Sequence, residues 1–282
     1  MKPEAKLLFD KGYEFLLQEG FSPREAKIQS KRLLLHQLES SNLEEVNVNE
    51  SSEEQFFSLL KERISGKPLQ YIEGTSQFMD FSFQINPQVL IPRPETENLV
   101  EVILEVLKDK KEEKFSFLEL GVGSGCILLS LLKYFSKSKG VGVDRSLKAI
   151  EVAQKNINNL DLEKRALLKQ SNWFDSLGQS TFDVLVSNPP YIANEDWVGL
   201  EKEVREEPKE ALLAGPSGLE CYEEIISKAK KFLNPNGFVF FEVGWEQADR
   251  VCGLLQQAGF EKIEKFLDDC GIERIVKAQH IK

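Results

Sequence analysis

The sequence predicts an α/β protein with a mostly parallel sheet, and three observations indicate this. Short apolar segments such as FSFLEL, GVGVD and FDVLVSN alternate with helical segments such as ILLSLLKYF and LKAIEVAQKNINNL. This alternation is typical of right-handed βαβ units. A glycine-rich turn follows the first of these strands, and FEKIEKF and IERIVKA near the end of the chain indicate a closing antiparallel strand pair.

An entirely helical segment, residues 1–68, precedes this α/β part. Ser22, Pro23 and Glu25 provide an N-cap hydroxyl, a proline at the first helical position and a capping glutamate. The stretch Ser51–Glu54 repeats the cap and the glutamate, and it predicts a further helix start. Acidic side chains slightly outnumber basic ones in this segment, so it is either a structural cap or a binding surface for a macromolecular partner.

Residues 69–90 predict a β-hairpin that links the helical segment to the larger domain. Aromatic residues recur there in an alternating pattern, with Phe78, Phe81 and Phe83 as the clearest examples. The remaining residues, 91–282, form the predicted α/β domain.

The composition argues against broad binding to nucleic acid or membrane. The chain has 282 residues, of which 41% are hydrophobic, and a net charge of −10. Such a charge opposes the neutralisation of many phosphates, on which nucleic-acid binding depends. No apolar run approaches the roughly 18 residues needed to span a bilayer. We therefore expect a cytoplasmic monomer with no direct contact to nucleic acid or membrane.

Cysteine and histidine usage bears on metal sites and nucleophilic catalysis. Cys126, Cys221, Cys252 and Cys270 form no Cys-x-x-Cys pair, and the chain has only two histidines. The sequence therefore gives little support for a zinc site, a thioredoxin-like motif or a Ser-His triad. We expect reduced thiols and no metal cofactor.

The turn Gly121-Val122-Gly123-Ser124-Gly125 lies between a strand and a helix. Glycine permits positive φ and lets a ligand approach the backbone without meeting a Cβ atom. The G-x-G-x-G spacing is shorter than the dinucleotide fingerprint, whose extra residue helps to seat a pyrophosphate. It therefore favours a nucleoside without phosphate over a merely tight turn.

Asp144 ends the next strand, where its carboxylate is expected to accept hydrogen bonds from both hydroxyls of a ribose. Asn172 and Trp173 follow a later strand, where an aromatic ring is able to cover an adenine. A core tryptophan is the plainer interpretation of Trp173 taken alone. In combination with the glycine turn, these residues indicate S-adenosylmethionine.

The segment VLVSNPPYIAN begins as a buried strand and ends at Asn188, Pro189, Pro190 and Tyr191. Neither proline has an N–H group, so the chain must leave the sheet there. Polar acceptors at the carboxyl end of such a strand lie where α/β sheets bind ligands. An ordinary strand-ending turn is the alternative explanation of the tetrapeptide alone.

Together, these motifs resemble class I methyltransferases that act on a planar amide or exocyclic amine nitrogen. The wider set, namely IPRPETE, SNWF, SNPPYI, EEP, GPSGL and DDCGIER, is similar to that of the family of glutamine-N5 methyltransferases of peptide chain release factors. The resemblance covers residues 70–282, whereas the N-terminal helices match only in style and length. It implies a Rossmann-like, seven-stranded class I methyltransferase domain that converts S-adenosylmethionine to S-adenosylhomocysteine.

The resemblance also implies roles for individual residues. Gly121–Gly125, Asp144 and the Asn172-Trp173 pair would hold the cofactor. Asn188 would border the cofactor and, with Pro189, Pro190 and Tyr191, bind the substrate amide. The substrate would be the glutamine of a Gly-Gly-Gln loop in class I release factors. The helical segment would bind the release factor at a surface away from that loop.

The chemistry of an amide agrees with these roles. An amide nitrogen is a poor nucleophile because its lone pair is delocalised into the carbonyl, so an enzyme has to orient it. The Asn188 side-chain oxygen and the Pro189 carbonyl would each accept one N–H of the substrate, and the Tyr191 ring would stack on the amide plane.

Four positions depart from the family pattern or have a simpler explanation. The family usually has aspartate where this chain has Asn172, and an aromatic residue where Glu206 precedes Glu207-Pro208. Arg93 and Glu95 are candidates for the cofactor pocket, although a helix start is enough to explain them.

Two other functions fit parts of the sequence. A DNA adenine-N6 or RNA guanine-N2 methyltransferase would use the same tetrapeptide on a flipped base, but it should carry a basic target-reading module. A non-catalytic, cofactor-binding adaptor should have lost the glycine turn or the Asn-Pro-Pro-Tyr motif, and both motifs are intact.

Overall fold

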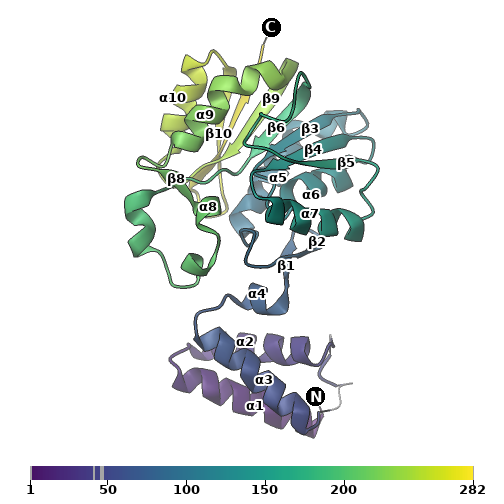
Figure 1. Cartoon of the computed structure of the whole chain (residues 1–282), viewed down its shortest axis with the longest axis vertical. Helices are drawn as coiled ribbons and strands as arrows, with labels where there is room; N and C mark the ends of the chain where they lie inside the picture. The colour runs from purple at the N-terminus through teal and green to yellow at the C-terminus, as the bar shows by residue number, and fades with distance from the viewer. Residues whose placement is uncertain (1, 41, 45–47, 282) are drawn as a thin grey trace. The chain divides into compact units, whose positions relative to one another are not determined.

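The structure is a computed structural model that describes residues 2–40, 42–44 and 48–281. The chain divides into two compact units (Figure 1). One unit comprises Met1–Thr75 together with Glu201–Glu206, and the other comprises Ser76–Leu200 and Glu207–Lys282. Parts of the predicted helical segment, residue 41 and residues 45–47, lie outside the described residues.

The first unit is helical, as expected, with α1 Pro3–Gln18, α2 Pro23–Gln37, α3 Glu50–Ile64 and the short α4 Leu69–Glu73. Its core is built from apolar side chains of the three long helices, including Leu8, Leu16, Leu33, Phe56 and Leu60. Burial of this shared apolar surface stabilises helices that would be marginal in isolation.

The N-terminus of α2 agrees with the sequence-based prediction, whereas that of α3 does not. Ser22 caps α2, and the predicted capping box with Glu25 is confirmed. The predicted start at Ser51 is wrong, because Asn49 is the N-cap of α3. Its side-chain oxygen accepts a hydrogen bond from the backbone N–H of Ser52 at 2.8 Å, which starts the helix at an earlier residue.

The structure also corrects the beginning of the predicted hairpin. The first residues of the 69–90 stretch form α4, because Pro68 precedes a helix start and Gly74, with φ of +70°, ends the helix in the left-handed region. The two hairpin strands follow as β1 Thr75–Phe78 and β2 Phe81–Gln84.

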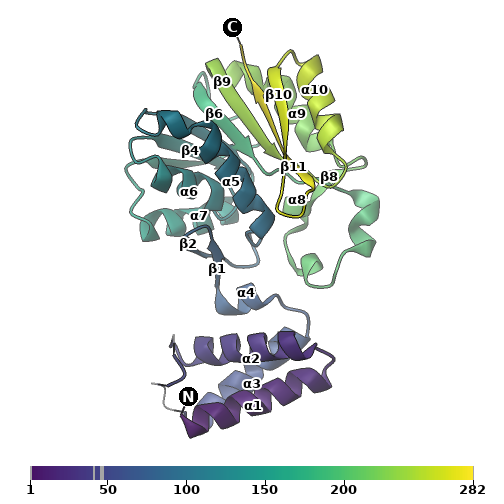
Figure 2. The same ribbon diagram turned by 180° about the vertical axis from the view of Figure 1, so that it is seen from behind.

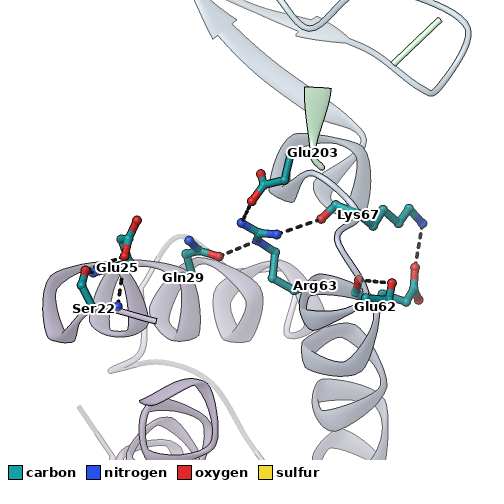
Figure 3. Close-up of polar contacts among 8 residues, drawn as sticks. Ser22, Glu25, Gln29, Glu62, Arg63, Lys67 and Glu203 are labelled. Carbon is teal, nitrogen blue, oxygen red and sulfur yellow. Dashed lines mark hydrogen bonds and ion pairs between the residues drawn. The ribbon is translucent and has the colours of Figure 1, made fainter. Parts of the chain in front are cut away.

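Arg63 holds several segments of the helical unit together (Figure 3). Its guanidinium donates to the Gln29 side-chain oxygen at 2.6 Å and to the Lys67 carbonyl, and it pairs with Glu203. The Arg63 side chain is 6% exposed and lies over the Phe21 ring. This buried, multiply bonded cation explains how a segment distant in sequence, Glu201–Glu206, belongs to the helical unit.

The second unit contains a seven-stranded sheet with helices on both faces (Figures 1 and 2). The strand order is β10-β11-β9-β6-β3-β4-β5, and β11 is antiparallel to both of its neighbours. The strands are β3 Ser116–Leu120, β4 Lys139–Asp144, β5 Ala166–Gln170, β6 Phe182–Ser187, β9 Leu233–Glu242, β10 Glu261–Leu267 and β11 Glu273–Gln279. The predicted fold class is confirmed.

Two apolar clusters cover the two faces of this sheet. One includes side chains of α9 Glu220–Ala229 and α10 Ala248–Gln257. The other includes side chains of α5 Pro94–Val106, α6 Cys126–Tyr134 and α7 Leu147–Asn159. Shorter elements complete the unit, namely β7 Ile192–Ala193, α8 Lys209–Leu212 and β8 Leu213–Gly215.

The sheet register brings the carboxyl ends of the central strands to one edge. Leu120 of β3 pairs with Val143 of β4 on one side and with Ser187 of β6 on the other. The residues that follow these strands therefore meet at the same edge, where open α/β sheets bind their ligands.

We predict that replacing Arg63 with methionine lowers the free energy of unfolding by about 2–3 kcal/mol, because hydrogen bonds to a buried cation are lost and their acceptors remain. Arg32 pairs with Glu73 in the same unit, but its side chain is 44% exposed. Arg32→Met should therefore lower stability by less than about 1 kcal/mol. Urea unfolding followed by circular dichroism compares the two, and equal losses would contradict this account.

Candidate active site

A cavity of about 610 Å³ lies at the carboxyl edge of the sheet, within the second unit. Its walls come from the turns after β3, β4, β5 and β6, from residues 88–96 and from residues 208–224. A cavity of this size accommodates a small molecule or cofactor.

The glycine turn forms one wall of the cavity. Gly121 and Gly123 have φ of +74° and +52°, a region that side-chain-bearing residues rarely adopt, and both line the cavity with Val122 and Ser124. The backbone N–H groups of Gly121 and Val122 both donate to the Val143 carbonyl at 2.9 Å, which fixes the turn to β4.

Gly125 has a different position from the other residues of the turn. It does not line the cavity, and it is the left-handed N-cap of α6. A Cβ atom there would lie 3.1 Å from a methyl carbon of Leu129. Gly125 therefore allows the helix to pack closely after the turn, and its predicted role in holding a cofactor stays a prediction.

Asp144 lines the cavity at the end of β4. One carboxylate oxygen accepts from the Gly123 N–H at 3.0 Å, and the other accepts from the Ser146 N–H at 2.9 Å. Burial raises the pKa of this carboxyl, and these two backbone N–H groups act in the opposite direction. A carboxylate accepts about four hydrogen bonds, so each oxygen keeps acceptor capacity for a ligand.

Trp173 and Asn172 lie on the same cavity. The Trp173 backbone has φ of +45°, and its indole N–H donates to a Glu224 carboxylate oxygen at 3.1 Å. This bond fixes the plane of a half-buried ring beside Gly121. The ring both packs against the apolar cluster that contains α9 and α10 and lines the cavity, so it is only partly enclosed by the core and a ligand-facing role stays a prediction.

The structure divides the Asn-Pro-Pro-Tyr motif between the cavity and the core. Asn188 and Pro190 line the cavity, whereas Pro189 is buried and Tyr191 packs against the apolar cluster that contains α9 and α10. Burial raises the pKa of Tyr191 to about 12. The predicted contacts of Pro189 and Tyr191 with a substrate stay predictions.

Two hydrogen bonds hold the ends of the motif. The Asn188 amide nitrogen donates to the Thr96 hydroxyl oxygen at 3.3 Å. The Tyr191 carbonyl accepts from the Gln247 side-chain nitrogen at 2.9 Å, and the same nitrogen donates to the Gly218 carbonyl. The turn is thus tied to α5 at one end and to the segment between β9 and α10 at the other.

Several residues of the cavity wall are predicted from the sequence only weakly or not at all. Arg93 lines the cavity and pairs with Glu207, whose other oxygen accepts from the Ile91 N–H at 3.0 Å. Glu207 is only 4% exposed, and its carboxylate joins the Glu-Pro segment to the IPRPETE segment. In the sequence, only the joint presence of the IPRPETE and EEP motifs indicates this ion pair. Glu95 is not among the lining residues.

Glu119 is not predicted from the sequence either, because it lies within the otherwise apolar strand segment FSFLEL. It lines the cavity, is 1% exposed, and accepts a hydrogen bond from the Leu128 N–H near the start of α6 at 2.9 Å. Burial raises the pKa of this carboxyl well above its usual range, the bond from Leu128 acts in the opposite direction, and nearby Asp144 adds to the increase.

All four cysteines have free thiols. Among the described residues, no group of three or more His, Cys, Asp or Glu side chains is arranged to hold a metal ion. Nor does that part of the chain contain a helix that is both long and apolar enough to cross a membrane.

Comparison with known proteins decides the family. The family model described as "Methyltransferase small domain" matches residues 96–218. The release factor glutamine methyltransferase of Caulobacter vibrioides is 40% identical over 231 residues, which cover 80% of this chain and 79% of that protein. This chain belongs to the release factor glutamine methyltransferase family. The predicted resemblance to that family is confirmed.

Further relatives show how far the similarity to the family extends. A protein named "Bifunctional methyltransferase" from Rickettsia typhi is 32% identical and aligns with 89% of this chain, but the chain spans only 53% of its length. A methyltransferase crystal structure from Pyrococcus furiosus superimposes with a TM-score of 0.51 at 18% identity, covering 71% of this chain and 89% of that one. At that identity, the structural likeness supports the methyltransferase fold alone.

In this family member, we predict that Glu119→Gln raises stability at about pH 8 relative to the unchanged chain. The folded-state pKa of Glu119 is raised, so ionisation above its unfolded pKa of about 4.3 destabilises the fold. A glutamine oxygen still accepts from Leu128 and does not ionise.

The stability gain should shrink as the pH falls toward about 4, where the Glu119 carboxyl is protonated in both states. Thermal unfolding of both proteins across this range measures the difference. Glu151→Gln, which changes an exposed carboxylate on α7, is the control and should show little pH-dependent change. A Glu119→Gln protein less stable than the unchanged chain at the higher pH would refute the prediction.

Proposed function

We propose that this chain transfers a methyl group from S-adenosylmethionine to the side-chain amide nitrogen of the glutamine in the Gly-Gly-Gln loop of class I release factors. The observation that carries the proposal is the 40% identity to a release factor glutamine methyltransferase, extending over most of both chains. The placement of Asn188 on the wall of a cofactor-sized cavity supports it.

The residues around the cavity fit S-adenosylmethionine. Gly121 and Gly123 present backbone without side chains, which leaves room for the close approach of a nucleoside. Asp144 keeps acceptor capacity for the two ribose hydroxyls, and the fixed Trp173 ring offers an aromatic surface for the adenine. Asn172, which is exposed at the cavity, would accept from the adenine amine through its side-chain oxygen.

When bound, S-adenosylmethionine supplies a methyl group made reactive by the positive charge of its sulfonium. The protein's own part is to orient the substrate nitrogen. The Asn188 side-chain oxygen and the Pro189 carbonyl would accept the two N–H groups of the glutamine amide, and the Tyr191 ring would lie against the amide plane. Orientation of this kind lowers reaction barriers by up to about 7–11 kcal/mol in ideal systems.

The remaining parts of the proposal concern the helical unit and the setting. The helical unit would bind the release factor away from the reacting glutamine, and Leu7 and Ile28, exposed by 60% and 46% on α1 and α2, offer apolar contact surface. Four free cysteines suit a reducing compartment such as the cytoplasm. We propose that the chain acts there as a monomer.

We predict that Asp144→Asn weakens binding of S-adenosylmethionine about tenfold, because hydrogen bonds to the ribose lose their charged acceptor. Isothermal titration calorimetry measures the affinity directly. Asp109→Asn, which changes an exposed aspartate outside the cavity, is the control and should bind as the unchanged chain does. Unchanged affinity in Asp144→Asn would remove Asp144 from the cofactor site.

We predict that Asn188→Ala lowers methyl transfer by at least about 100-fold and leaves S-adenosylmethionine binding within about threefold, because it removes an acceptor that orients the amide. Asn159→Ala, at the exposed end of α7, is the matched control. Near-normal transfer by Asn188→Ala would refute the role of the asparagine.

The substrate class is tested by incubating the protein with labelled S-adenosylmethionine and separate pools of class I release factor, tRNA, rRNA and DNA. The proposal expects label on the release factor glutamine. Label on nucleic acid alone would overturn the substrate assignment, and label on none of the pools would overturn the proposed activity.

A further inference from the structure

A buried carboxylate lies directly behind the Asn-Pro-Pro-Tyr motif. Glu242 is the last residue of β9, and the register pairs Phe241 with Ser187, so Glu242 comes beside Asn188 where both strands end. Its side chain belongs to a residue that is only 2% exposed, and it does not line the cavity. A carboxylate in such a place requires an explanation, because burying one without full pairing is costly.

Glu242 forms a small polar cluster with Thr96 and Asn188. Thr96, on α5, is 3% exposed and accepts the hydrogen bond from the Asn188 amide nitrogen at 3.3 Å. The Thr96 and Asn188 side chains also lie close enough to the Glu242 carboxylate for their hydrogen-bond donors to lower its pKa. One Glu242 oxygen, Oε2, has no hydrogen-bond partner among the described residues.

The chemistry of the three groups fixes the direction of these bonds. An ionised carboxylate only accepts, so Thr96 must donate its hydroxyl hydrogen to Glu242. The Thr96 oxygen is then left with lone pairs and accepts from the Asn188 nitrogen. The two hydrogens of that nitrogen thus have two acceptors within reach, the Thr96 hydroxyl at the cavity wall and the Glu242 carboxylate, which does not line the cavity.

The direction matters because an asparagine side chain has nearly the same shape when its oxygen and nitrogen are exchanged. In the orientation present, the nitrogen is engaged by Thr96 and Glu242, which leaves the oxygen for the cavity. In the exchanged orientation, the side chain would present N–H groups to a substrate amide that itself needs acceptors. The exchange would bring the Asn188 oxygen against the Glu242 carboxylate, which repels it.

We propose that Glu242 is a positioning residue that, directly and through Thr96, holds the Asn188 amide with its oxygen toward the cavity. This proposal rests on the proposed function, because it explains how Asn188 is kept ready to accept an N–H of the substrate glutamine. Glu242 does not touch the substrate, so its effect should appear in the turnover number and not in cofactor binding.

The ionisation of Glu242 adds a pH dependence. The pKa of Glu242 is raised to about 7, mainly by burial and also by the nearby charge of Glu95, while the Thr96 and Asn188 donors and the charge of Arg274 act in the opposite direction. Tyr191, Tyr222 and Cys126 also interact electrostatically with this carboxylate, and burial raises the pKa of each of these three groups. They are therefore neutral at the pH at which Glu242 titrates.

Protonation gives Glu242 a hydrogen to donate, which removes the constraint on the direction of the bonds. The Asn188 oxygen then gains a donor on the buried side, and the exchanged orientation becomes accessible. The turnover number should therefore be highest above about pH 7 and should fall as the pH drops through that value.

The test compares Glu242→Gln, Thr96→Val, Thr96→Ser and the control Glu101→Gln, which changes an exposed glutamate on the same helix as Thr96. Turnover on a class I release factor is measured from about pH 6 to about pH 9, with S-adenosylmethionine affinity and circular dichroism for each protein. We expect Glu242→Gln to lose about 10- to 100-fold in turnover and to lose the fall in rate near neutral pH, with cofactor affinity retained.

Thr96→Val should show a similar loss of turnover, Thr96→Ser should keep most of the activity because it keeps the hydroxyl, and Glu101→Gln should match the unchanged chain. If Glu242→Gln does not fold, the comparison of Thr96→Val with Thr96→Ser tests the proposal. Turnover and pH profile unchanged in Glu242→Gln, or equal loss in the two Thr96 variants, would overturn the proposal. Absence of methylation by the unchanged chain would instead overturn the proposed function.

Discussion

Two consecutive prolines end a central strand of the sheet, and the arrangement of the site follows from that constraint. Strand β6 lies between β3 and β9, where a strand would normally continue its hydrogen bonds on both sides. Pro189 and Pro190 have no N–H to donate, so β6 stops at Ser187. The backbone beyond that point offers acceptors without donors, which suits a ligand group that brings its own N–H bonds.

Other segments of the second unit place further cavity-lining residues beside the end of β6. The parallel register of β3, β4 and β6 makes their carboxyl ends coincide, so the glycine turn, Asp144 and Asn188 line one cavity. The apolar clusters on both faces of the sheet keep that edge in place. Asp144 is bonded to two backbone N–H groups and Trp173 to Glu224, so both are fixed before a ligand arrives. Such preorganisation is what orientation-based catalysis requires.

Much of this was predictable from the sequence, because its signals are local. The Ser22 capping box, the glycine turn and the proline pair each act through residues that are neighbours along the chain. The predicted start of α3 at Ser51 is wrong for a reason that is also local, since Asn49 competes with the serines as the N-cap. The sequence could not reveal the pairs that depend on tertiary packing. Thr96 and Asn188 are 92 residues apart, and Arg93 and Glu207 are 114 apart.

A crystal structure of the protein with S-adenosylhomocysteine and a peptide that contains Gly-Gly-Gln tests this arrangement most directly. We expect the glutamine side-chain nitrogen within hydrogen-bond distance of both the Asn188 side-chain oxygen and the Pro189 carbonyl, with the Asn188 nitrogen still donating to Thr96. A glutamine amide bound elsewhere, or an Asn188 amide that turns its nitrogen toward the peptide, would contradict it.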